Sequence, residues 1–280
     1  PIKDIVSIIF GYIRYYNDKI LTKEIIMDKK IMINKLILQK NELLILAKNS
    51  KYIIDLYVYN LGTDKIKLKK INNNEESILA VNKKDVYLMD DWGEIYKINN
   101  NKKEKIIKAN RHIHTMCADD ENIFFLEIGC TSYPSIIHYN MRTKNREEYT
   151  DRNIIFIYLY KNYLYILQYD NKIKKVDIND NSSEIINLDK KIFVTYKTYL
   201  FVNDTHIFIG TSRKIYCINN NGKIIKKIYH RKNMLDFYID NDKLYVAYHK
   251  IKTMDIRLAI YQLYDSFVNY TNLGNQIKDQ

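Results

Sequence analysis

The stretch NDTHIFIGTSRKIYCINNNGKIIKKI, residues 203–228, predicts three β-strands joined by tight turns. Residues 206–209 and 214–218 have the apolar and aromatic content of strands, and the lysine-rich residues 224–228 follow as a third. Asn221 and Gly222 form the dipeptide most typical of a hairpin turn, because both tolerate positive φ. Three antiparallel strands cannot cover their own apolar face, so this unit needs neighbours of the same kind.

Such neighbours recur along the chain. The second strand of each unit ends in an apolar or aromatic residue, usually followed by asparagine. This landmark occurs at Tyr59, Ile98, Tyr139, Ile178, Ile218 and Leu263, with spacings of 39, 41, 39, 40 and 45 residues. A spacing near 40, with strands of period two and no helical periodicity between them, is typical of a β-propeller made of four-stranded blades.

The predicted fold is therefore all-β, with under about a tenth of the residues in helices. Residues 31–280 form six full blades, and residues 1–30 form an N-terminal part-blade, so the ring has six or seven blades. In blade five we expect the innermost strand at residues 192–196. In blade six we expect the outermost strand near residues 267–271.

Residues 1–30 also allow a second interpretation, as a short helical extension. Ile5, Ile8, Ile9, Tyr12, Ile13 and Tyr16 lie at helical spacing, which places them on one face of a helix. In that interpretation, PIKDIVSIIFGYI resembles the opening helix of an F-box. We favour strands, because the register of the repeats continues into this segment.

Two blades resemble the repeats of quinoprotein-like propellers, which read roughly V-Y-x-G-T-x-x-G-x-L-Y-A-L-D. The matching segments are residues 207–223 and 91–98. The resemblance implies the propeller fold, but Trp92 is the only tryptophan, so the tryptophans that join successive blades in the enzymes are absent. This departure argues against chemistry with a quinone, and no cofactor is expected. WD40-like propellers are an alternative relation, although their Gly-His and Trp-Asp pairs are missing.

The composition sets further bounds on function. The net charge is +12, 46% of the residues are hydrophobic, and the excess of Lys, Ile, Asn and Tyr suggests an A/T-rich genome. The cysteines Cys117, Cys130 and Cys217 show no spacing typical of zinc sites or disulfides, as expected in a reducing compartment. No apolar run approaches the about 18 residues of a membrane span, so we expect a cytoplasmic protein without membrane insertion.

His112 and His114 are the residues that most suggest a metal. In a regular strand both side chains point to one face, and near the propeller axis they could share a metal ion. The sequence does not identify a third ligand, and ordinary hydrogen-bonded histidines are the simpler interpretation. A metal-dependent enzyme with a site near the axis is therefore kept as an alternative function.

The lysines suggest a second alternative, binding to nucleic acid or to another anionic surface. Most of them fall on or beside predicted outermost strands; Lys65, Lys67 and Lys69, for example, alternate with apolar residues. Lysine on an exposed strand edge prevents edge-to-edge aggregation, so the charge also has a structural explanation.

The preferred interpretation is a non-enzymatic module that binds a protein partner. Loops on a rigid scaffold commonly carry recognition, and in a propeller the turns between the second and third strands lie on one face. Aromatic residues and arginine dominate binding energy at interfaces. The candidate partner-binding residues in these turns are Trp92, Tyr133, Arg213, Lys250 and Lys252. The oligomeric state and the partner's identity stay open.

Overall fold

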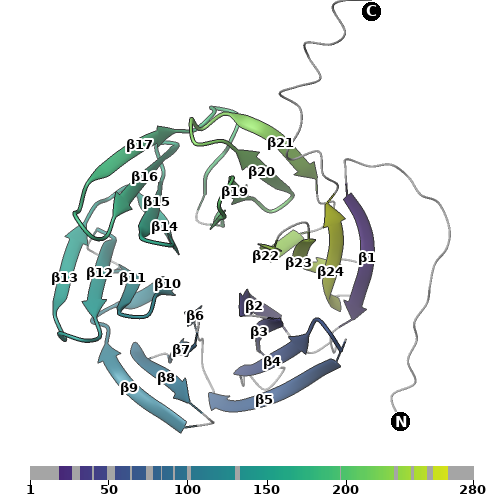
Figure 1. Ribbon diagram of the computed structural model, residues 1–280, viewed down its shortest axis with the longest axis horizontal. Helices are drawn as coiled ribbons and strands as arrows, with labels where there is room; N and C mark the ends of the chain where they lie inside the picture. Colours follow the sequence, from purple (N-terminus) through teal and green to yellow (C-terminus); the bar gives the residue numbers. More distant parts are fainter. Residues whose placement is uncertain are drawn as a thin grey trace, which may run out of the picture.

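A computed structural model shows the chain as a ring of β-sheets around a central axis (Figure 1). The structure describes residues 19–26, 32–39, 41–48, 54–63, 65–73, 78–82, 84–90, 92–99, 102–129, 133–195, 197–229, 233–240, 243–250 and 255–263. These residues form strands and turns and contain no helix, in agreement with the all-β prediction. In the described part of the chain, therefore, no helix is long and apolar enough to span a bilayer.

The described strands form six antiparallel sheets of four strands, the blades of a propeller. In each blade the strands are A, B, C and D from the axis outward. Blade one contains β2 (Met32–Gln39), β3 (Glu42–Lys48), β4 (Ile54–Asn60) and β5 (Lys65–Asn73). Blade two contains β6 (Ile78–Val81), β7 (Val86–Met89), β8 (Glu94–Asn99) and β9 (Lys102–Lys108). Blade three contains β10 (His112–Ala118), β11 (Asn122–Ile128), β12 (Ser135–Asn140) and β13 (Arg146–Thr150).

The remaining blades follow the same order. Blade four contains β14 (Ile154–Tyr160), β15 (Tyr163–Gln168), β16 (Lys172–Asp177) and β17 (Ser183–Asn187). Blade five contains β18 (Tyr199–Val202), β19 (Ile207–Gly210), β20 (Lys214–Ile218) and β21 (Ile224–Tyr229). Blade six contains β22 (Asn233–Asp240), β23 (Lys243–Lys250), β24 (Asp255–Leu263) and, as its outermost strand, β1 (Lys19–Ile26).

The N-terminal strand closes the ring. β1 pairs antiparallel with β24, from Lys19 opposite Leu263 to Ile26 opposite Arg257, and Figure 1 shows it on the outer edge of blade six. The prediction of a strand in residues 1–30 is confirmed for β1, but its assignment to a separate part-blade is wrong. Without β1, the outer edge of β24 would be unpaired, which is why the two ends of the chain meet in one blade. The predicted strand at 267–271 and the helical alternative for residues 5–16 lie outside the described residues.

The innermost strand of blade five also differs from the prediction. Residues 192–196 were expected to form it, whereas the strand is β18, which begins at Tyr199. Ile192 and Val194 are buried and Phe193 is exposed, so the segment has the alternation of a strand. Its buried residues instead hold the connection from β17 against the apolar cluster between blades four and five.

The core lies between neighbouring blades. The cluster between blades five and six combines Phe208 and Ile215 from blade five with Phe237 and Val246 from blade six. Each blade therefore buries its apolar faces only when both neighbouring blades are present. This agrees with the inference from residues 203–228 that one unit needs neighbours to cover its apolar face.

Gly210 lies at a point where this packing leaves no room. A Cβ atom added there would lie 2.3 Å from Cε1 of Phe237 and 2.9 Å from Cε of Met234, both on β22 of the next blade. We expect Gly210→Val to lower the free energy of unfolding by about 3 kcal/mol, as overpacking of a core does. Gly62→Val is the control in a thermal melt, because the nearest atom to its Cβ is 3.5 Å away. Equal melting temperatures for the two variants would contradict this close packing of blades five and six.

Candidate functional site

The turns of the propeller lie on two opposite faces. The B–C turns and the D–A connections between blades lie on one, called here the B–C/D–A face, and the A–B and C–D turns lie on the other. Four large aromatic side chains are exposed on the B–C/D–A face: Trp92 (73%), Tyr133 (58%), Tyr169 (51%) and Phe193 (78%). The other exposed large apolar side chains among the described residues lie on D strands: Ile66, Tyr149, Ile185, Ile225 and Tyr229. The described part of the A–B/C–D face has none.

Trp92 lies at the tip of the turn between β7 and β8. Gly93 N donates a hydrogen bond to Asp90 O at 3.0 Å, and Gly93 adopts a φ of 74° that glycine accepts without strain. The side-chain carboxylate of Asp90 accepts a hydrogen bond from Glu94 N at 2.9 Å. These contacts hold the turn while the indole points into solvent, so Trp92 does not join blade two to blade three.

Backbone hydrogen bonds tie the B–C turns to the D–A connections beside them. Ala109 N donates to Gly93 O at 2.8 Å, and Asp151 N donates to Pro134 O, next to Tyr133, at 3.1 Å. Tyr169 N donates to Asn153 O at 2.8 Å. The aromatic side chains are therefore carried on connected turns, and a partner that binds them would lose little freedom in ordering the backbone.

Phe193 is held outward by its two neighbours in sequence. Ile192 and Val194 are buried in the cluster between blades four and five, which turns the Phe193 ring toward solvent. Ile192 N donates a hydrogen bond to Asp189 O at 2.9 Å, and the Tyr216 hydroxyl donates to Lys191 O at 3.5 Å. The exposed ring thus projects from a fixed segment of backbone.

The exposed charges of this face are mainly basic. Arg152, Lys190, Lys191 and Arg213 are exposed on its turns and connections. The carboxylates nearby have partners: Asp151 accepts from Gln168 Nε2 and Asn153 N, both at 2.9 Å, and Asp189 accepts from Lys191 N at 2.9 Å. Asp170, beside Tyr169, is exposed and pairs with Lys172. The face therefore offers cations to a partner more readily than anions.

The predicted partner-binding residues are only partly brought together. Trp92, Tyr133 and Arg213 are exposed on B–C turns of blades two, three and five. Lys250 ends β23 of blade six, and Lys252 lies outside the described residues.

Sequence reasoning missed Tyr169 and Phe193. Tyr169 lies in a B–C turn, directly after β15, and was open to the argument applied to Trp92. Phe193 was missed because residues 192–196 were expected to form a strand.

The two histidines do not form a complete metal site in the described residues. The pairing of β10 with β11 shifts register between Ile113 and Thr115, so a β-bulge at His114 breaks the alternation on which a shared face depended. His112 is exposed, whereas burial lowers the pKa of His114, with further lowering by the charges of His112 and Lys35. Within the described part of the chain, no group of three His, Cys, Asp or Glu side chains could hold a metal.

Many lysines lie on the outermost strands of the blades, as the sequence pattern predicted. The outermost strands β5, β9 and β21 contain Lys65, Lys67, Lys102, Lys103, Lys226 and Lys227. The basic charge is thus spread around the outer edge of the ring as well as over the B–C/D–A face.

These features define a six-bladed β-propeller with an aromatic, basic face. Among solved structures, the chain is similar to BamB from Moraxella catarrhalis, with a TM-score of 0.51 and 11% identity over 88% of this chain and 98% of that one. It is also similar to the AfRom2 CNH domain, with a TM-score of 0.52 and 9% identity over 88% of this chain and 99% of that one. Raptor from Chaetomium thermophilum gives a TM-score of 0.58 and 11% identity over 85% of this chain but only 24% of that one.

The similarity concerns the fold. It confirms, at that level, the resemblance to quinoprotein-like propellers. No known family matches the sequence, and no curated protein has a sequence similar enough to be recognised as a relative.

Proposed function

We propose that this propeller is a non-enzymatic module that binds a protein partner through its B–C/D–A face. The observation that carries the proposal is the segregation of Trp92, Tyr133, Tyr169 and Phe193 onto this face. Large exposed apolar groups gathered on one surface are typical of interaction sites, whereas singly scattered ones need no explanation.

The four aromatic residues belong to one sector of the ring. They come from the B–C turns of blades two, three and four and from the connection between blades four and five. In Figure 1 this sector runs along one side of the ring, from β7 and β8 to β17. A partner that reaches all four residues extends across several blades, as an extended segment or the flat face of a folded domain does.

The charges favour an acidic partner. Arg152, Lys190, Lys191 and Arg213 surround the aromatic residues in the same sector and in blade five. Acidic groups placed around apolar anchors would match this arrangement, and opposite charges accelerate association. Binding should then slow as salt is added, because exposed charges more than about 10 Å apart are screened at about 0.1 M salt.

Trp92→Ala and Phe193→Ala are expected to weaken the complex by about 2 kcal/mol each, as truncation of aromatic anchors does. Both side chains are mostly in solvent, so the melting temperature should stay close to that of the original protein. The measurement is the affinity of purified variants for the partner that the original protein captures from its native host.

Tyr149→Ala is the matched control for these variants. Tyr149 is an exposed aromatic residue on the D strand β13, at the outer edge of the ring. Its removal should leave the affinity unchanged. Loss of binding with Tyr149→Ala, but not with Trp92→Ala or Phe193→Ala, would move the binding surface to the outer edge of the ring.

A further inference from the structure

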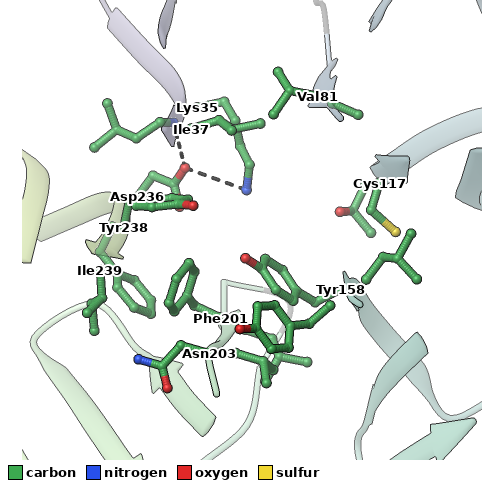
Figure 2. A pocket seen from close by; sticks show the side chains of 18 of the residues that line it. Lys35, Ile37, Val81, Cys117, Tyr158, Phe201, Asn203, Asp236, Tyr238 and Ile239 are labelled. Carbon is green, nitrogen blue, oxygen red and sulfur yellow. Dashed lines mark hydrogen bonds and ion pairs between the residues drawn. The ribbon is translucent and has the colours of Figure 1, made fainter. Parts of the chain in front are cut away.

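A cavity of about 880 Å³ occupies the centre of the ring, and the innermost strands of all six blades line it. This volume lies in the range of about 300–1,000 Å³ that is usual for small-molecule sites. The cavity is separate from the aromatic residues of the B–C/D–A face, none of which lines it. Figure 2 shows several of its side chains pointing toward the open centre.

The cavity residues of the six A strands lie in levels, each at one height along the axis of the ring, because every A strand pairs with its B strand in the same way. The middle level contains the A-strand residues that are paired with Leu44, Tyr87, Phe124, Tyr165, Phe208 and Tyr245. Blades one to three contribute Ile37, Ala80 and Cys117 to it, and blades four to six contribute Tyr158, Phe201 and Tyr238. One half of the middle level is thus aromatic, whereas the opposite half is aliphatic or small.

The aromatic half forms a continuous wall. The centroid of the Phe201 ring lies 5.4 Å from that of Tyr158 and 4.7 Å from that of Tyr238. These contacts join rings from three consecutive blades. The planes of neighbouring rings are inclined by 59° and 67°. Ala80 and Cys117 on the opposite side leave space in front of this wall, which a flat ring system would fill by stacking on one ring and meeting the others edge to face.

The next level along the axis, two residues before the middle level in each A strand, contains a lysine that reaches into the cavity. Lys35 and Asp236 lie at one level, together with Thr115 and Phe156. Lys35 Nζ lies 3.6 Å from Asp236 Oδ2 and 5.4 Å from the centroid of the Phe156 ring, and Figure 2 shows it pointing into the cavity. At 3.6 Å the contact with Asp236 is longer than a hydrogen bond, so the three N–H donors of the ammonium are not used up by it.

Asp236 already has a structural partner. Leu36 N, in blade one, donates a hydrogen bond of 2.8 Å to Asp236 Oδ2, which joins blades one and six. The carboxylate is therefore committed to ring closure and to balancing Lys35. The Lys35 ammonium therefore keeps donors for a ligand at this level.

The carboxylates at the mouth of the cavity are remote from Lys35. Asp240 lies four residues along β22 from Asp236, about 13 Å at about 3.3 Å per residue. Asp204, also at the mouth, is paired with Lys161. Across such a separation, the repulsion of an anion held at Lys35 is weak beside the attraction of the ammonium in direct contact with it.

We propose that the axial cavity binds a small planar aromatic molecule with one acidic group. The ring system packs against the aromatic wall of Tyr158, Phe201 and Tyr238, and the acidic group accepts hydrogen bonds from Lys35. This site acts independently of the B–C/D–A face.

The test uses two fluorescent probes with the same ring system, 8-anilinonaphthalene-1-sulfonate and the uncharged N-phenyl-1-naphthylamine. We expect the folded protein to bind one equivalent of the sulfonate, at least about tenfold more tightly than the neutral probe, because the sulfonate adds a charge-assisted hydrogen bond. Equal affinity for the two probes, or no saturable binding of the sulfonate, would overturn the proposal.

The variant that isolates Lys35 is Lys35→Met combined with Asp236→Asn, which removes both charges and keeps an acceptor for Leu36 N. It should weaken sulfonate binding at least about tenfold and leave binding of the neutral probe unchanged, while Lys35→Arg retains sulfonate binding. If the double variant binds the sulfonate like the original protein, Lys35 only balances Asp236 and the proposal fails. The double variant Trp92→Ala/Phe193→Ala should bind the sulfonate probe like the original protein. If this variant lost probe binding, the probe would lie on the B–C/D–A face, which would also overturn the cavity site.

Discussion

Removal of residues 1–30 is expected to lower the free energy of unfolding by several kcal/mol and to make the protein prone to aggregation. The reason is the loss of β1, which pairs with β24 from Lys19 opposite Leu263 to Ile26 opposite Arg257. The truncated chain would expose the edge of β24, and an unpaired edge is a template for pairing with other chains. In a chain of this size, a loss of several kcal/mol lowers the melting temperature by roughly 5–10 °C.

Thermal melts and size-exclusion chromatography of the truncated chain measure this effect. A synthetic peptide covering residues 19–26, added in excess, is the control that isolates β1 from the other residues removed. It should restore part of the lost melting temperature. A truncated chain that stays monomeric and melts like the original protein would mean that β1 does not close the ring.

The second large effect is expected from Tyr216→Asp. Tyr216 is buried in the cluster between blades four and five, beside Ile186 and Leu188. The substitution removes a packed ring, which costs about 3–5 kcal/mol, and places a carboxylate in an apolar cluster, where burying the charge costs more. A nearby cation is Lys227, whose Nζ lies 6.0 Å from the centroid of the Tyr216 ring at the edge of this cluster. We expect the ring to unfold in one cooperative transition at a much lower temperature, since the core is shared between blades.

Tyr216→Phe is the matched control for this substitution. It keeps the ring and removes only the hydroxyl, whose hydrogen bond to Lys191 O is long at 3.5 Å. Its cost should be under about 1 kcal/mol. If Tyr216→Asp melted like Tyr216→Phe, the assignment of Tyr216 to the buried side of β20 would be wrong.

The architecture was predictable from the sequence because its signals are local and repeated. The landmarks from Tyr59 to Leu263 lie at or near the ends of C strands, and a turn of asparagine and glycine at residues 221 and 222 separates β20 from β21. Repetition allows a weak signal in one blade to be checked against five others. The predicted strand at residues 214–218 illustrates the gain, because it matches β20 and its Tyr216 is buried between blades.

The errors concern features that depend on distant parts of the chain. Lys19 and Leu263 are 244 residues apart, and no local pattern indicates that β1 completes blade six. Residues 192–194 alternate like a strand because they pack on a neighbouring blade, so only the packing distinguishes the two cases. The level that Lys35 shares with Asp236 depends in turn on β-bulges in β2 and β22.

The central claim, that the B–C/D–A face recognises a protein partner, is tested most directly by hydroxyl-radical footprinting of the complex. Oxidation of each aromatic side chain is measured by mass spectrometry with and without the captured partner. We expect the partner to protect Trp92, Tyr133, Tyr169 and Phe193 while Tyr149 and Tyr229, exposed on D strands, stay equally reactive. Protection of Tyr149 and Tyr229 with unchanged oxidation of the four face residues would contradict the account.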